Sequence, residues 1–172
     1  MAIKISVITF ILSLVILSGP VLAAMQPVLY FNPDVVETNP GENNHVLLMM
    51  DNADHGLSGY GIVISVNDPA IASVSSASVP AWAGVVDVRQ IDKSSVIIQA
   101  TDISDSLIPG SGTIVLADLI IHAGSPGYGY LTATPIAIDD DMKGRYSPDI
   151  IPGSIIIAGA GPVPIIPMST ET

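Results

Sequence analysis

The run from residue 60 to residue 67 constrains the fold more than any other part of this chain, because its apolar side chains recur at every second position. In an extended strand one face would carry Tyr60, Ile62, Ile64 and Val66. The opposite face would carry Gly61, Val63, Ser65 and Asn67. This alternation predicts a half-buried strand of an antiparallel sheet. The pattern leaves open which of the two faces is directed to solvent.

The rest of the chain repeats this theme as short β-forming runs between turn residues, and Val, Ile and Ser dominate the runs. No window has a sustained helical period, and β-branched residues favour a pleated surface. We therefore predict an all-β fold, a nine-stranded antiparallel β-sandwich with jelly-roll topology. The predicted strands are Val28–Asn32, His45–Asp51, Gly59–Asn67, Ile71–Val79, Val85–Gln90, Ser95–Thr101, Thr113–His122, Tyr128–Asp139 and Ser154–Ala158. Because Thr113–Ile121 is almost entirely apolar, we expect it to be a central strand buried on most of both faces.

The two ends of the chain differ from this central domain. Residues 1–23 contain one Lys, an apolar run, and small or modest side chains before Ala24, the pattern of a secretory signal peptide. The alternative is an uncleaved N-terminal anchor. Residues 24–158 then form the domain, and the Pro-rich tail 159–172 is predicted to be an extended linker that contacts a neighbour. No second apolar run is long enough for a membrane span, so we expect a secreted, extracellular or cell-surface protein.

Charge excludes several classes of partner. After removal of the signal, four basic and sixteen acidic residues would remain, a formal net charge of −12. Such a chain cannot neutralise a phosphate backbone, which argues against nucleic acid and against anionic membranes. The sequence contains no Cys, so the domain must be stable through its hydrophobic core alone.

The order of several motifs points to a family. In chain order the motifs are NPG at residues 39–41, NADHGLSGYGIVISVNDPAIA, VPAWAG, QATD, PGSGTIVLADLIIHA and IDDDMKGRYSPDIIPGSIII. This order, from Gln26 to Ala158, resembles the cohesin-like domain of the carbohydrate-binding module 2/3 superfamily, in particular its archaeal secreted and surface versions. The resemblance implies a jelly-roll sandwich that binds a calcium-loaded dockerin through one sheet. Here that sheet would hold the strands near 59–67, 85–90, 95–101 and 128–139; no individual contact residue is transferred.

Four aromatic residues are candidates for a binding surface: Tyr60, Trp82, Tyr128 and Tyr130. Trp82 is either a sugar-stacking platform or a plug at one end of the sandwich with its N–H bonded to a carbonyl. Tyr128 and Tyr130 lie on one side of a strand and either stack on a ligand or pack across strands. We favour packing in both cases, because a planar cellulose-binding face needs several aromatic residues in a row.

The densest acidic group is Asp139, Asp140 and Asp141, a candidate calcium site because Ca²⁺ takes six to eight oxygen ligands. Its spacing is not that of an EF-hand, and Lys143 and Arg145 are alternative partners for the charges. No other cofactor is expected. No pattern indicates a zinc site, a nucleophile elbow or a pair of catalytic carboxylates, so we predict that the protein is not an enzyme.

Three functions remain open at this point. The first is a cohesin-like module that binds a dockerin-type protein, and the second is a carbohydrate-binding module for a polysaccharide. The third is a structural subunit of a cell envelope or filament that self-associates through its C-terminal tail. Sparse aromatic residues count against the second.

Overall fold

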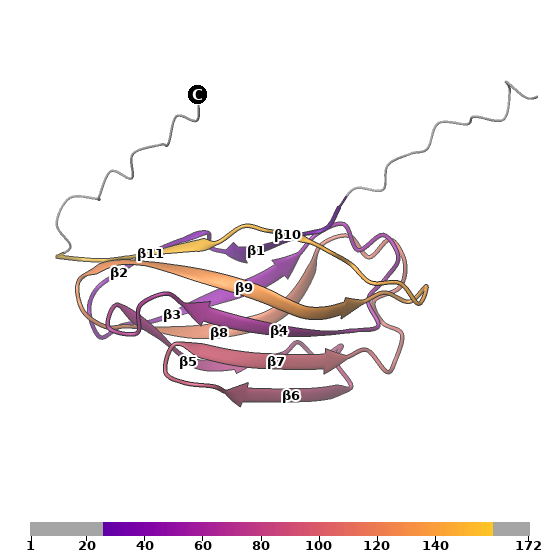
Figure 1. The fold of residues 1–172 in the computed structure, drawn as a ribbon, viewed down its shortest axis with the longest axis horizontal. Coiled ribbons are helices and arrows are strands. Elements are labelled where there is room, and N and C mark those ends of the chain that lie inside the picture. Colours follow the sequence, from indigo (N-terminus) through magenta and orange to yellow (C-terminus); the bar gives the residue numbers. More distant parts are fainter. Residues whose placement is uncertain (1–25, 160–172) are drawn as a thin grey trace, which may run out of the picture.

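A computed structural model describes residues 26–159 of the protein. In it, two β-sheets pack face to face (Figure 1). One sheet has five strands in the order β10-β1-β3-β8-β5, and the other has six in the order β2-β11-β9-β4-β7-β6. The strands are β1 (Val28–Asn32), β2 (Val35–Thr38), β3 (Asn43–Met50), β4 (Gly59–Val66), β5 (Ala72–Ser78), β6 (Val85–Gln90), β7 (Ser95–Thr101), β8 (Ile114–Ala123), β9 (Gly127–Asp139), β10 (Asp149–Ile150) and β11 (Gly153–Ile157).

The predicted all-β sandwich with jelly-roll connections is confirmed. The chain crosses to the other sheet after almost every strand, and among the described strands only β6 and β7 are consecutive within one sheet. This hairpin apart, neighbours in each sheet come from distant parts of the sequence. Between residues 26 and 159 no helix is long and apolar enough to cross a membrane.

Each of the nine predicted runs forms a strand, but the described residues hold two short strands more. β2 pairs with β11 and β10 pairs with β1, and both pairs are parallel, so the sheets are not purely antiparallel. The sequence did not predict these two strands, because β2 has four residues and β10 has two, which is too short for an alternating pattern to be recognised. They tie the beginning of the domain to its end.

The alternating run identified in the sequence is β4, which lies between β9 and β7 in the middle of the six-stranded sheet. Its core side is made by Tyr60, Ile62, Ile64 and Val66, each at most 5% exposed. Gly61, Val63 and Ser65 lie on the opposite side, where Val63 and Ser65 are half-buried and the small Gly61 is buried. The structure thus decides the question that the pattern left open: the side of Gly61, Val63 and Ser65 faces outward.

The apolar run 113–121 is predicted to be a central strand buried on most of both faces, and the structure bears this out fully for one face only. β8 does lie inside its sheet, between β3 and β5, and its inward residues Leu116, Leu119 and Ile121 are buried. On the outer side Val115 and Ile120 are half-buried. A two-layer sandwich has no third layer to cover this face, so neighbouring strands alone shield these side chains.

Candidate functional site

The outer face of the six-stranded sheet joins β9, β4 and the β6–β7 hairpin, which come from three separate parts of the sequence. The register places their residues in rows across the sheet. One row reads Val85, Thr101, Gly59 and Asp139, and the next reads Asp87, Gln99, Gly61 and Ala137. The pairing shifts by a bulge between Gly61 and Ile62, which leaves Ile136 without a partner opposite it on β4.

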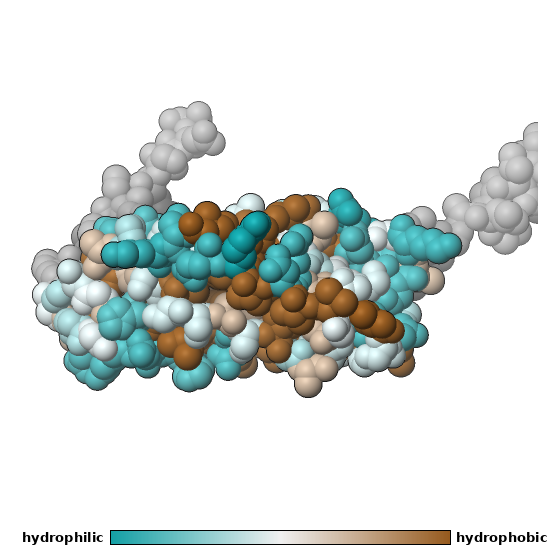
Figure 2. Space-filling model, turned by 90° about the horizontal axis from the view of Figure 1, so that it is seen from below, coloured by the Kyte–Doolittle hydropathy of each residue, from teal (hydrophilic) through white to brown (hydrophobic). Residues whose placement is uncertain are grey.

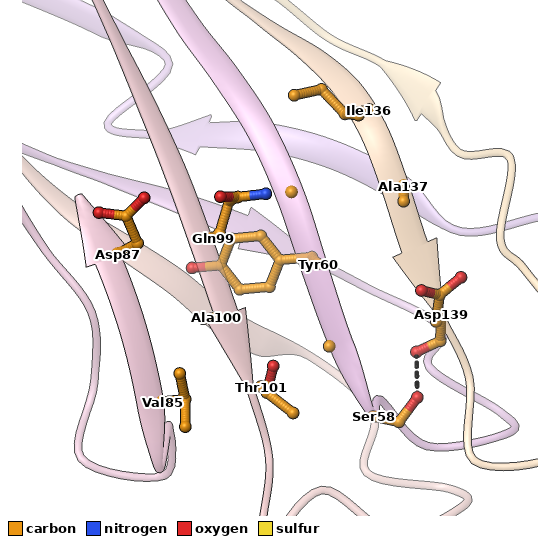
Figure 3. Close-up of a pocket in the computed structure, with 12 residues that line it drawn as sticks. Ser58, Tyr60, Val85, Asp87, Gln99, Ala100, Thr101, Ile136, Ala137 and Asp139 are labelled. Carbon is orange, nitrogen blue, oxygen red and sulfur yellow. Dashed lines mark hydrogen bonds between the residues drawn. The ribbon is translucent and has the colours of Figure 1, made fainter. Parts of the chain in front are cut away.

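The two glycines of β4 lie in the middle of these rows and open a hollow in the sheet face. Its volume is about 510 Å³. Figure 3 shows its sides: β9 carries Ile136 and Asp139 on one side, while β7 and β6 carry Gln99, Thr101, Asp87 and Val85 on the other. With no side chain on β4 to fill the space, the backbone of the central strand forms the floor.

Gly59 and Gly61 have different surroundings. A Cβ atom on Gly59 would lie 2.8 Å from the carbonyl oxygen of Ala100, closer than such contacts allow. A Cβ atom on Gly61 would meet nothing nearer than Gln99 and Ile136, at 3.7 Å, which is ordinary van der Waals contact. Close strand packing therefore demands glycine at position 59, whereas the glycine at position 61 only keeps the hollow open.

The walls of the hollow combine apolar and polar groups. Val85 and Ile136 are 56% and 55% exposed, large fractions for aliphatic side chains. Asp139 is paired with Arg145, whose Nε lies 2.8 Å from Oδ1 of Asp139. The side chains of Asp87 and Gln99 form no hydrogen bond or ion pair with any other described residue. A side chain from a partner that offers both an apolar stem and a polar end would satisfy this mixture.

Tyr60 is a candidate surface residue that the structure places elsewhere, so we correct its assignment. Its ring points into the core, is 5% exposed, and its hydroxyl donates to the carbonyl oxygen of Leu116. Burial raises the pKa of this hydroxyl strongly. The ring also packs against Trp82, with ring centroids 6.1 Å apart.

Trp82 is half-buried and lies against the core. Its indole N–H donates to the carbonyl oxygen of Val115 on β8, at 3.1 Å. This geometry is that of the plug, the alternative that the sequence favoured, although the carbonyl belongs to a strand and not to a loop.

Tyr128 and Tyr130 lie on the same side of β9, as their spacing predicted, and the structure shows that this is the outer side. They face Ile156 and Ser154 of β11, and Tyr130 is 45% exposed. The N–H of Tyr130 is held by the side-chain oxygen of Asn67. The pair lies toward the other end of β9 from Ile136 and Asp139, so the hollow and the tyrosines are separate surfaces.

The three consecutive aspartates point to three different partners. Asp139 pairs with Arg145, while Oδ1 of the buried Asp140 accepts the N–H groups of Met142 and Gly144. Asp141 has its Oδ2 shielded from solvent without a hydrogen bond. Desolvation, then repulsion from Asp105, Asp102 and Asp140, raises the pKa of Asp141.

The described residues contain no group of three or more His, Asp or Glu side chains positioned to hold a metal ion. Asp140 instead closes its own loop, with His55 Nδ1 at 3.4 Å from Oδ2. The aspartates thus have local structural roles, and calcium binding by this loop stays a prediction from sequence.

Sequence reasoning missed the residues that shape the hollow, Asp87, Gln99 and Ile136 among them. A usable signal was present in β4, where glycine occupies two successive positions of one face in an otherwise apolar strand. Glycine inside a strand often marks the close approach of another chain. The polar and apolar walls come from other strands, and only the register brings them together.

Comparison with known proteins identifies the fold. No protein-family model matches the sequence, and no curated protein matches it. Among solved structures, the cohesin CaCohA2 from Clostridium acetobutylicum is similar at a TM-score of 0.66 and 19% identity, over 82% of this chain and 96% of that one. The Coh-OlpA–Doc918 complex, a type I cohesin–dockerin complex from Clostridium thermocellum, matches at 0.65 and 14%, over 77% and 99%. A non-cellulosomal cohesin from the archaeon Archaeoglobus fulgidus matches at 0.60 and 17%, over 78% and 91%.

Proposed function

We propose that this protein is a non-catalytic binding module that docks a dockerin-type protein on the outer face of β9, β4, β7 and β6. One observation carries the proposal: the hollow over Gly59 and Gly61 opens in the middle of the sheet that the family resemblance implies as the binding sheet. A partner segment can lie on this broad face and insert one side chain into the hollow. Fully enclosed anchor side chains of this kind dominate the energy of many interfaces.

The structural neighbours support a protein partner. Cohesins of this fold are described in complex with dockerins, in Clostridium thermocellum and in Acetivibrio cellulolyticus. The unpaired Asp87 and Gln99 on the rim favour a partner that presents a hydrogen-bond donor, and the net charge of −11 favours a basic partner surface. No pair of groups in the hollow resembles a nucleophile with its base, which fits a module without catalysis.

Secretion completes the proposal. It rests on the signal-like residues 1–23, which lie outside the described part of the chain, as does the tail from residue 160. We propose that the domain acts outside the cell or at its surface, with the tail as a linker. Sequencing the N-terminus of the exported protein tests the first point: a start at Ala24 supports cleavage, and a retained Met1 supports the anchor.

Filling the hollow tests the binding face. The Cβ atom of Gly61→Leu would make only ordinary van der Waals contacts, so the fold should remain while the leucine side chain fills the hollow. Ser73→Leu, which adds the same side chain to the outer side of β5 in the opposite sheet, is the matched control. Calcium-loaded dockerin modules should bind the unchanged protein and the Ser73 variant equally, and the Gly61 variant at least tenfold more weakly. Equal binding by all three proteins would refute the proposal.

A carbohydrate ligand is the second candidate, and the outward pair Tyr128 and Tyr130 favours it. Two rings at alternate positions of one strand offer a short stacking surface for sugars. Affinity electrophoresis on cellulose, chitin and xylan distinguishes this candidate. Retardation that is lost in Tyr130→Ala would support it, whereas unchanged mobility on all three polysaccharides would dismiss it.

The third candidate is a structural subunit whose tail engages a neighbouring copy by strand addition. The apolar segment PVPIIPM in the tail favours it. Size-exclusion chromatography of the whole protein and of a form truncated after Gly159 tests it. A larger species that depends on the tail would support the candidate, and identical monomers would exclude it.

A further inference from the structure

β6 ends the six-stranded sheet with an open edge. It is hydrogen-bonded on one side only, to β7, and all six of its residues are exposed. Val86 and Val88 are 46% and 37% exposed, although they alternate with the outward residues and so point toward the opposite sheet. Figure 2, which views the molecule from the side where β6 lies in Figure 1, shows hydrophobic atoms in a band along this side. An open apolar edge of this kind is a template for another strand.

The backbone groups on this edge can be assigned from the ladder with β7. The N–H of Ile91 donates to the carbonyl oxygen of Ser95 at 2.9 Å, in the same register that pairs Arg89 with Ile97. Along an antiparallel ladder, successive residues direct their N–H and C=O groups alternately to one side and to the other. The odd-numbered residues therefore bond to β7, and Val86, Val88 and Gln90 direct their backbone groups to the free edge.

The sequence of β6 is complementary to that of a second copy of β6 running in the opposite direction. In an antiparallel pair of two copies centred on Val88, Val88 faces Val88 of the second copy, and Asp87 faces Arg89. Beyond these, Val86 faces Gln90, and Val85 faces Ile91. Each opposite pair shares a face of the joined sheet, so Asp87 and Arg89 meet twice across the two-fold axis.

We propose that β6 is a self-association edge, on which a second copy of this chain pairs β6 with β6 antiparallel about Val88. The pairing supplies backbone partners for Val86, Val88 and Gln90 and covers the exposed valines. It also gives partners to Asp87 and Arg89, neither of which forms an ion pair within the described chain. Two six-stranded sheets would then form one continuous sheet across the dimer.

Charge favours a second copy over an unrelated strand. β6 contains neither Lys nor Pro, the residues that commonly protect edge strands from pairing. Its two charges are of opposite sign and lie at equal distances from Val88, an arrangement that attracts its own copy and discriminates against strands of uniform charge. The proposal does not depend on a dockerin partner, but it would place two hollows beside each other on one surface.

Sedimentation velocity of the full chain, processed by its expression host, tests the proposal at concentrations up to about 1 mM, because a single strand pair makes a small, weak interface. The unchanged protein should show a dimer fraction that rises with concentration. Val88→Pro removes an edge N–H and no bond to β7, so this variant should remain folded and monomeric.

Charge exchange gives the specific control. Asp87→Arg and Arg89→Asp each place like charges opposite one another twice, and each should weaken the dimer by about tenfold or more. The double variant restores both ion pairs and should return the dissociation constant to within about threefold of the unchanged protein.

Thermal melting establishes whether each variant is folded. If Val88→Pro fails to fold, the charge-exchange variants alone test whether β6 pairs with β6. A protein that stays monomeric throughout would overturn the proposal. So would a dimer that a folded Val88→Pro variant leaves intact, or a folded double variant that does not recover association.

Discussion

Gly59 and Gly61 show how one residue type serves two purposes within a single strand. At position 59 the carbonyl oxygen of Ala100 leaves no room for a side chain. At position 61 there is room, and the missing side chain creates the hollow. The distinction concerns contacts of one atom, so it can be tested by adding one methyl group.

We expect Gly59→Ala to lower the free energy of unfolding by about 1–3 kcal/mol, because the new Cβ atom must displace backbone. Gly61→Ala should change it by less than about 0.5 kcal/mol, since its contacts are ordinary. Urea denaturation of the two variants measures the difference. Equal losses at both sites would contradict the inference that a side chain at position 61 can be accommodated without displacing its neighbours.

Asp141 lowers the stability of the folded state by an amount that depends on pH. Its pKa is raised from the ordinary 3.8, so the folded state holds this proton more tightly than the unfolded chain does. Below pH 3.8 the carboxyl is protonated in both the folded and the unfolded state, so it does not lower the free energy of unfolding. As pH rises through the raised pKa, the shielded group must ionise beside other acids, and stability falls.

Asp141→Asn should therefore raise the melting temperature at pH 7, and this gain should vanish near about pH 3. The exposed Asp34→Asn is a control that should leave the melting temperature nearly unchanged at both pH values. A gain of equal size at both pH values would show that packing, and not charge, explains the effect of Asp141.

At the scale of elements, β4 combines the core and the outer face in alternating residues. Ile62 is fully buried between the sheets, whereas Val63 is half-buried on the outer side. Ile62→Ala should cost about 2–5 kcal/mol of unfolding free energy, and Val63→Ala about 1 kcal/mol or less. Chemical denaturation of both variants compares the two faces of one strand directly, and similar costs would mean that the faces are assigned wrongly.

Alternation in β4 was enough to predict a strand but not its orientation. Each face carries residues that could lie inward or outward, and the structure buries Tyr60, which packs against Trp82, together with Ile62 and Ile64. Tyr60 shows the consequence, because it was predicted to belong to a binding surface while its hydroxyl donates to the carbonyl oxygen of Leu116 in the core. Periodicity is a local property, whereas orientation depends on the opposite sheet.

Long runs were predictable and short ones were not. All nine predicted runs are strands in the structure. They could be predicted because each is long enough to be recognised from its composition and from the turn residues on either side. β2 and β10 exist through pairing with β11 and β1, partners more than one hundred residues away in the sequence. The hollow was unpredictable for a related reason, since its walls come from β9, β7 and β6 and meet only through long-range register.

For the whole molecule, the two sheets differ in what their outer faces offer. The six-stranded sheet combines a hollow of about 510 Å³ at its centre with an open edge at β6, while a hollow beside β1 of the five-stranded sheet, lined by Tyr30 and Ile151 among others, is smaller at about 300 Å³. A module of this design can bind one partner on the face and a second copy at the edge. The face is the surface on which we propose that a dockerin-type protein binds.

Binding at this face is tested most directly by adding a calcium-loaded dockerin to the isotope-labelled protein and mapping the changes in amide chemical shifts. The largest shifts should cluster at Gly59 to Gly61, Gln99 to Thr101, and Ile136 and Ala137. Amides of Leu47 and Ile120, on the outer side of the opposite sheet, should remain unchanged. Shifts concentrated on those strands, or no shifts at near-millimolar dockerin, would contradict binding at this face.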